Sequence, residues 1–154
     1  MIRIIKADIS NIEKAYQIRL EMLRDVNNLE DDSAFSDEFK ANIKSYFSRD
    51  DQTTVIALND ENVITGCATI CYISIMPTFS HPSGKRACIM NVYTRKPYRR
   101  QGIAKKMLEQ LIEQARQKGV TEISLDATEL GKPLYECCGF IKNDEGMVLD
   151  LNSR

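Results

Sequence analysis

The clearest pattern of hydrophobic and polar positions along this chain predicts a helix over residues 102–118. Its apolar residues recur three and four positions apart, which is the spacing of a helix that packs by one face. They are Ile103, Ala104, Met107, Leu108, Leu111, Ile112 and Ala115. The helix begins at Gly102, follows a strand and a basic turn, and is closed by Gly119 at a position where helices commonly end.

The rest of the chain also divides into strands and helices, without a repeat or a linker. Alternating and β-branched residues predict strands at 2–6, 53–59, 63–75, 86–94, 121–127 and, at the end of the chain, about 139–143 and 147–151. Helical spacing predicts a helix from Ser10 or Asn11 to near Asp25, a second one that starts at Ser36, and a short one near 132–138. Residues 76–85 form a loop. We expect one domain over residues 1–154.

Composition and charge exclude several classes of function. The 154 residues are 43% hydrophobic and carry 21 basic and 22 acidic side chains, so the formal net charge is −1. No global field therefore favours nucleic acid or an anionic membrane, and a binding surface must be local. Residues 1–6 lack the apolar run of a secretory leader, and no segment approaches the roughly 20 apolar residues that span a bilayer. We expect a cytoplasmic protein.

The five cysteines are odd in number and form no C-x-x-C pair, which argues against a zinc site. Cys67, Cys71 and Cys88 lie in strand segments and are expected to pack as small hydrophobic residues. No metal site is expected. The adjacent pair 137–138 leaves open a nucleophilic cysteine in a two-step transfer, although no base stands near it in the sequence.

The basic turn that precedes the 102–118 helix is predicted to bind a pyrophosphate. The first amides of a helix lack intrahelical partners and lie at the positive end of its dipole, so an anion is stabilised there. Gly102 has no side chain to block the anion, and Arg99 and Arg100 add cationic donors. The spacing matches neither G-x-x-x-x-G-K-[ST] nor G-x-G-x-x-G. One alternative is a structural domain that binds only phosphate, and it would explain this motif but no other feature of the chain.

Two motifs together resemble the GNAT superfamily of acyl-CoA-dependent N-acyltransferases. Residues 99–104, Arg-Arg-Gln-Gly-Ile-Ala, are similar to its Arg/Gln-x-x-Gly-x-Gly/Ala signature, and residues 134–140, Leu-Tyr-Glu-Cys-Cys-Gly-Phe, to its Leu-Tyr-x-x-x-Gly-Phe ending. Pro97 stands one residue later than usual. The resemblance implies an α/β fold with a mixed, mostly antiparallel sheet and about four helices. It also implies that the fourth and fifth strands run parallel and splay apart.

For the site, the resemblance implies acetyl-CoA as cosubstrate, with pantetheine between the splayed strands and pyrophosphate at the helix start. The implied cofactor-binding residues are Val92, Tyr93, Thr94, Arg99, Arg100, Gln101, Gly102, Ile103, Ala104 and Thr128. The acceptor would be a primary amine of a small molecule or a protein. Homodimers are common in the superfamily, but the sequence leaves the oligomeric state open.

The resemblance makes Tyr135 the general acid, because a phenol placed near the sulfur can protonate the departing CoA thiolate. No general base is evident. Histone-modifying members carry a Glu in the fourth strand, whereas residues 87–90 hold no carboxylate. His81, the only histidine, is expected to be a loop residue without a role, and a water relay would remove the amine proton. A non-catalytic acyl-CoA sensor or partner subunit therefore remains the alternative.

Residues 25–38 contain six carboxylates and no Lys or Arg. In the superfamily this connection lies over the acceptor side of the cleft, so one hypothesis is that it attracts a cationic acceptor by local negative potential. The alternative is a solvated loop whose acidic residues cap the helix that starts at Ser36.

Overall fold

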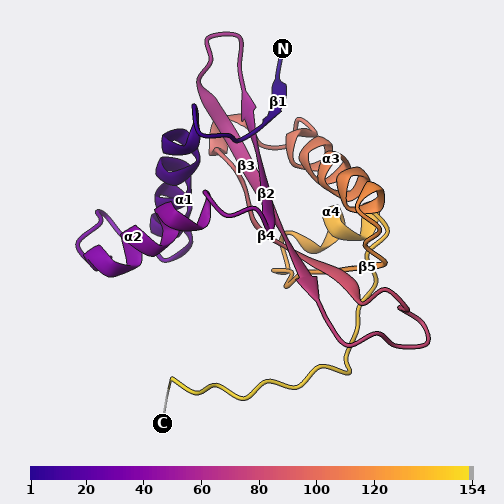
Figure 1. The fold of residues 1–154 in the computed structure, drawn as a ribbon. Helices are drawn as coiled ribbons and strands as arrows, with labels where there is room; N and C mark the ends of the chain where they lie inside the picture. The colour runs from indigo at the N-terminus through magenta and orange to yellow at the C-terminus, as the bar shows by residue number, and fades with distance from the viewer. Residues whose placement is uncertain (153–154) are drawn as a thin grey trace.

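A five-stranded sheet organises the computed structural model, which describes residues 1–152 (Figure 1). The strands lie side by side in the order of the chain, and they are β1 (Arg3–Lys6), β2 (Gln52–Leu58), β3 (Ile64–Ser74), β4 (Lys85–Thr94) and β5 (Glu122–Ser124). β1 to β4 pair antiparallel with their neighbours, whereas β5 runs parallel to β4. The mixed, mostly antiparallel sheet expected from the sequence is confirmed.

Helices cover both faces of this sheet. α1 (Ile12–Val26) and α2 (Asp37–Tyr46) lie on one face, and α3 (Ile103–Gln117) and α4 (Lys132–Cys137) lie on the other (Figure 1). A short 3-10 turn, η1 (Lys96–Tyr98), connects β4 to α3. None of the helices in the described part of the chain is long and apolar enough to cross a membrane.

The periodic face of α3 forms the larger core. Met107, Leu108 and Leu111 are fully buried and pack with buried residues of the sheet such as Ile70 and Ile89. Each large side chain buried in this way stabilises the fold by about 1.5–3 kcal/mol relative to an exposed one. A smaller core lies under α1, where Ile18 packs with residues of β2 and β3. The sheet is therefore fixed from both faces.

β4 contains a bulge near its end. Tyr93 pairs with Cys67 and Met90 pairs with Thr69, so two residues of β4, Asn91 and Val92, lie opposite one residue of β3. Asn91 adopts a positive φ of 61°, which asparagine tolerates better than most residues. The bulge turns the Asn91 side chain toward α1, where it is 7% exposed.

The two terminal strands predicted at about 139–143 and 147–151 are wrong for this structure. Residues 140–150 contain no strand, and β5 is shorter than the predicted 121–127. Three apolar residues of this C-terminal segment, Ile141, Met147 and Val148, are at least nine-tenths exposed. Alternation along the sequence suits a strand, but a strand also needs a neighbour for its backbone N–H and C=O groups. In Figure 1 the segment extends away from the sheet and finds no such neighbour.

Candidate active site

β4 and β5 separate at one end. Their pairing covers only Arg86 with Glu122, Ala87 with Ile123 and Cys88 with Ser124. β4 then continues to Thr94 paired with β3 but not with β5. Backbone groups on the β5 side of this part of β4 therefore have no strand partner. This is the splayed geometry expected from the sequence, and Val92, Tyr93 and Thr94 all lie on the unpaired part.

The start of α3 lies directly after this unpaired part and η1. Gly102 occupies the N-cap position with φ 79°, and Arg100 before it also has a positive φ, 63°. The first turn of α3 contains no acidic side chain, and a Cβ built on Gly102 would meet no protein atom within 4 Å. Glycine is thus required here by the backbone conformation, and the space in front of the free amides is open.

The side chains of Tyr93 and Arg99 contact α1. The Tyr93 hydroxyl donates to Asp25 Oδ2 at 3.3 Å, and Arg99 Nη2 donates to the same oxygen at 3.2 Å. Arg99 Nε also donates to the Thr94 carbonyl at 2.8 Å. Burial, followed by the charge of Asp25, raises the pKa of Tyr93 to about 12. Arg100 forms no ion pair within residues 1–152, so it is the arginine of this turn that remains available to an anion.

Arg95 connects the same region to α1 a second time. Its guanidinium donates to both carboxylate oxygens of Glu21, at 2.9 to 3.1 Å, and to the Ile64 carbonyl at 2.7 Å. A bidentate pair of this kind fixes orientation as well as distance. The contact was not predicted, because only folding brings together two residues that are 74 positions apart.

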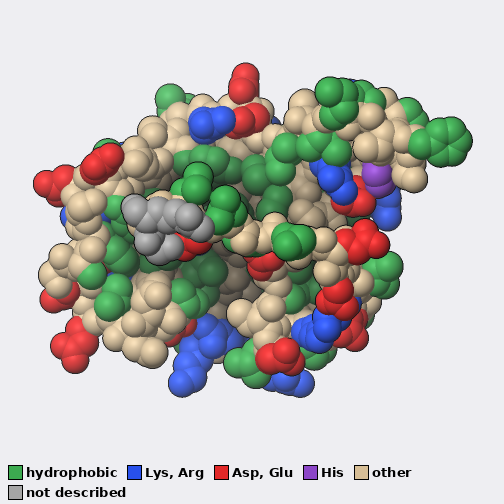
Figure 2. All heavy atoms as spheres, turned by 90° about the horizontal axis from the view of Figure 1, so that it is seen from below, with side chains coloured by type: hydrophobic (Ala, Val, Ile, Leu, Met, Phe, Trp, Pro, Cys, Tyr) green, Lys and Arg blue, Asp and Glu red, His purple; other side chains and the backbone are tan. Residues whose placement is uncertain are grey.

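Tyr135 lies on α4 and lines a groove of about 1540 Å³ along β5, together with Ser124 and Asp126. Its ring packs edge-on against Phe140, with the centroids 6.0 Å apart. Its hydroxyl forms no hydrogen bond within the described residues, and burial, followed by the nearby Cys138, raises its pKa. A hydroxyl with this pKa stays protonated at neutral pH, as a proton donor must. Seen from the side of the C-terminal segment, the molecule is hollowed, with hydrophobic side chains deep in the hollow and charged ones at its rim (Figure 2).

Thr128 stabilises the turn that leads into α4. Its hydroxyl accepts a hydrogen bond from the Gly131 amide at 3.1 Å. A Cβ on Gly131 would lie 3.1 Å from a ring carbon of Tyr135 and 3.3 Å from the Thr128 hydroxyl. The absence of a side chain at 131 therefore lets the ring of Tyr135 lie against this turn.

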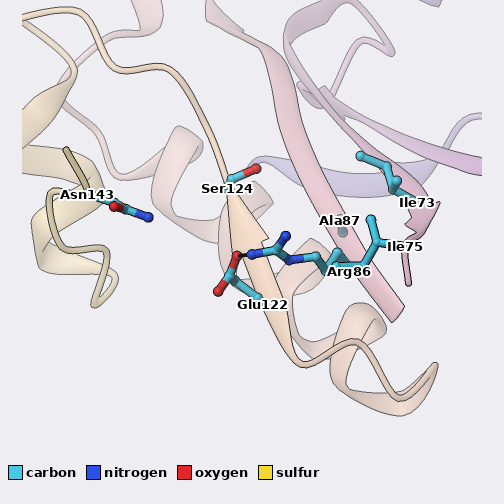
Figure 3. Close-up of a pocket in the computed structure, with 7 residues that line it drawn as sticks. All are labelled: Ile73, Ile75, Arg86, Ala87, Glu122, Ser124 and Asn143. Carbon is cyan, nitrogen blue, oxygen red and sulfur yellow. Dashed lines mark hydrogen bonds and ion pairs between the residues drawn. The ribbon is translucent and has the colours of Figure 1, made fainter. Parts of the chain in front are cut away.

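His81 lies at the other end of β4 and β5. Its Nδ1 is 2.9 Å from the Thr121 hydroxyl, and its Nε2 is 3.1 Å from a carboxylate oxygen of Glu122. Glu122 also pairs with Arg86, and the two side chains point toward one another beside a pocket of about 270 Å³ (Figure 3). His81 thus connects the β3–β4 loop to β5, a structural role that its loop sequence did not indicate.

A row of buried polar side chains crosses the α1 face of the sheet. Asn91 Nδ2 donates to Thr69 Oγ1 at 3.2 Å, Thr69 and Thr54 hydroxyls are 2.7 Å apart, and Thr54 donates to Gln52 at 2.8 Å. Arg19 of α1 joins this row by donating to Asn91 Oδ1 at 3.2 Å. Polar residues alternating with apolar ones in the strands were the available signal.

Several carboxylates of the acidic segment 25–38 are paired with basic side chains, so the segment carries less unpaired negative charge than its sequence suggested. Asp25 pairs with Arg99, Asp32 pairs with Arg24 at 2.5 Å, and Asp37 lies 3.9 Å from Lys40. The carboxylate of Asp31 accepts the Ser33 amide. Ser36 caps α2 through the Phe39 amide, so the capping explanation of this segment is supported by its contacts.

The cysteines are free thiols. Cys67 is fully buried, and burial raises its pKa to about 12. Cys138 lies at the end of α4, where burial and the adjacent Cys137 raise its pKa. Thiols with raised pKa values are weak nucleophiles at neutral pH, which disfavours the two-step cysteine alternative at Cys138.

Comparison with known proteins assigns the family. Residues 15–140 match the model of the acetyltransferase (GNAT) family. A predicted acetyltransferase from Clostridium acetobutylicum, solved with acetyl-CoA, is 30% identical, and the alignment covers 100% of this chain and 99% of that one with a TM-score of 0.85. A glucosamine-6-phosphate N-acetyltransferase from Arabidopsis thaliana has the same fold, at 22% identity, 99% coverage of each chain and a TM-score of 0.71.

A curated relative, the glucosamine 6-phosphate N-acetyltransferase of Trypanosoma brucei brucei, is 33% identical over 88 residues. These residues are 57% of this chain, and the match spans 58% of the length of that relative. The family match, in contrast, extends from α1 to the end of the motif that contains Tyr135 and Phe140. This chain belongs to the GNAT acetyltransferase family.

Proposed function

We propose that this protein is an N-acetyltransferase that moves the acetyl group of acetyl-CoA to a primary amine. The observation that carries the proposal is the open start of α3 at Gly102, which follows the part of β4 that is not paired with β5. The first feature suits the pyrophosphate of CoA and the second suits the amide groups of pantetheine. Acetyl-CoA is the cosubstrate of the family.

The proposed cofactor contacts divide between backbone and side chains. Backbone groups of Val92, Tyr93 and Thr94 would pair with pantetheine, and the amides of residues 100–104 would hold the pyrophosphate. Arg100 and Gln101 are exposed at the turn and would add donors. Arg99 would act mainly by fixing the turn, since its guanidinium already contacts Asp25 and the Thr94 carbonyl. Thr128 would contribute by placing the start of α4.

The proposed reaction is a direct attack. The neutral amine forms a bond to the thioester carbonyl carbon, and the tetrahedral intermediate then breaks its C–S bond. Tyr135 gives its proton to the departing thiolate of CoA. The amine proton leaves through water, and water returns a proton to the Tyr135 phenolate, so the protons balance over one turnover. The half-buried hydroxyl of Tyr135, which has no hydrogen-bond partner among residues 1–152, is free for this role. His81 is not assigned as base, because its ring nitrogens already contact Thr121 and Glu122.

The experiment that tests this function is thiol release from acetyl-CoA in the presence of a library of primary amines and lysine peptides. Transfer predicts thiol release above the rate of hydrolysis together with an acetylated amine of matching mass. A protein that binds CoA tightly in calorimetry but releases no thiol with any amine would instead be the acyl-CoA sensor or partner subunit. Sedimentation of the purified protein tests whether it forms a homodimer.

A further inference from the structure

Arg19 differs from the other arginines that lie on α1 or contact it. Arg24, Arg95 and Arg99 each pair with a carboxylate, at 2.5, 2.9 and 3.2 Å respectively. Arg19 has no carboxylate within 4 Å among the described residues. Its Nη1 donates to Asn91 Oδ1 at 3.2 Å and lies 3.6 Å from the sulfur of Met22. Within residues 1–152, its only oxygen partner is therefore a neutral amide.

Burying a guanidinium with one neutral acceptor costs free energy unless another group also accepts its hydrogen bonds. Arg19 lies between α1 and the sheet and is only partly exposed, and burial lowers the pKa of its guanidinium. A guanidinium carries several N–H donors in a planar fork, and one neutral acceptor leaves most of them unused. An anion bound beside it would supply both the missing acceptors and the missing charge.

The position of Arg19 indicates which anion this could be. Its partner Asn91 forms the β4 bulge, beyond the last residue of β4 that pairs with β5. Under the proposed function this unpaired part of β4 borders the thioester. Arg19 reaches it from α1, on the face of the sheet opposite to α3 and Tyr135. The guanidinium thus lies on the α1 face of the sheet, beside the part of β4 that would border the thioester.

We propose that Arg19 is a specificity-determining residue that binds an anionic group, a carboxylate or a phosphate, on the amine acceptor. This inference rests on the proposed function, and it reverses the sign of the acceptor suggested by the acidic segment 25–38. Asn91 acts as a positioning residue, since its Oδ1 holds one guanidinium nitrogen while its Nδ2 is anchored on Thr69. The remaining donors of Arg19 face the acceptor.

The first test compares matched amines with the wild-type protein. Each anionic acceptor is paired with its neutral counterpart: L-amino acids with their amides, and hexosamine phosphates with the free hexosamines. The expected result is a kcat/KM at least tenfold higher for the anionic member of the preferred pair. The carboxylate and phosphate pairs distinguish the two sources of negative charge. Preference for neutral or cationic amines would overturn the assignment of Arg19, while it would leave the acetyltransferase function intact.

The second test uses Arg19→Gln and Arg19→Lys, with Arg24→Gln as the matched control on the same helix. Loss of a desolvated charge partner costs on the order of 30- to 5,000-fold, so Arg19→Gln should lower kcat/KM by a factor in this range for the anionic acceptor. The neutral counterpart should change less than threefold, and Arg19→Lys should recover part of the loss. KM for acetyl-CoA should be unchanged, which also shows that the variant is folded. Arg24→Gln should behave like the wild type.

An equal loss for anionic and neutral acceptors in Arg19→Gln would make Arg19 a structural support of the bulge and would overturn the proposal. No loss for either acceptor would overturn it as well. If the wild-type protein releases no thiol with any amine, the proposed transfer itself fails, and this result is distinct from both of the others.

Discussion

Glu21 of α1 and Arg95, which follows β4, form a bidentate ion pair with N–O distances of 2.9 to 3.1 Å. Both side chains are 31% exposed, and Arg95 also donates to the Ile64 carbonyl. The pair therefore connects the helix on one face of the sheet to the residues that lead into the start of α3.

Replacing Glu21 by Gln should loosen this connection. The charge of Arg95 would lose its partner in a partly buried place, and we expect a loss of about 1–3 kcal/mol in unfolding free energy, or roughly 3–8 °C in Tm. KM for acetyl-CoA should rise several-fold, because the turn before Gly102 is less well fixed. Glu113→Gln is the control, since Glu113 forms an exposed pair with Arg116 at 3.4 Å and should change little. Equal melting temperatures for Glu21→Gln and wild type would contradict the structural role.

Gly102→Val should remove CoA binding. Its side chain would project into the space in front of the free amides of α3, where we place the pyrophosphate. A β-branched residue is also strained at φ 79°, so part of the effect will appear as reduced stability. Gly119→Val separates the two effects, because Gly119 has φ 80° and lies just beyond the other end of the same helix. Calorimetry should show at least a tenfold weaker Kd for CoA in the first variant only. Similar Kd values in the two folded variants would rule out the pyrophosphate site.

Tyr135→Phe should lower kcat by about 10² to 10⁴, with little change in KM for acetyl-CoA, because the hydroxyl acts only as the thiolate departs. Burial raises the pKa of Tyr135. The protonated phenol is the active form, so activity due to this group should persist through neutral pH and fall only above about pH 10. This alkaline decrease should be absent from the Phe variant. Tyr72→Phe removes another half-buried hydroxyl, outside the groove, and serves as control. Identical pH profiles of kcat for Tyr135→Phe and wild type would reduce Tyr135 to a packing residue.

His81→Ala should leave kcat/KM within about twofold of wild type while lowering Tm by a few degrees. The imidazole connects the β3–β4 loop to Thr121 and Glu122, so its loss should lower the stability of the fold and leave the reaction rate unchanged. The measurement is a melting curve alongside steady-state kinetics. A folded His81→Ala protein with more than tenfold lower kcat would show instead that His81 takes part in proton transfer.

The sequence by itself determined the parts of this protein that depend on local spacing. Four features follow from residues that are close along the chain: the period of α3, the cap at Ser36, the basic turn before Gly102 and the position of Tyr135. Such features need only local conformational preferences and one buried face. They were sufficient to identify the family and the order of most strands.

Tertiary structure decided what depends on distant partners. Hydrogen bonding between Arg19 and Asn91 joins residues 72 positions apart, and the pairing of Arg95 with Glu21 joins residues 74 apart. Neither contact leaves a pattern in the sequence, because each joins a residue of α1 to a position that lies beside the helix only after folding. The prediction of terminal strands is wrong for the same reason. Alternation at 147–151 indicates a segment that could form a strand, but strand pairing also requires a second backbone beside it.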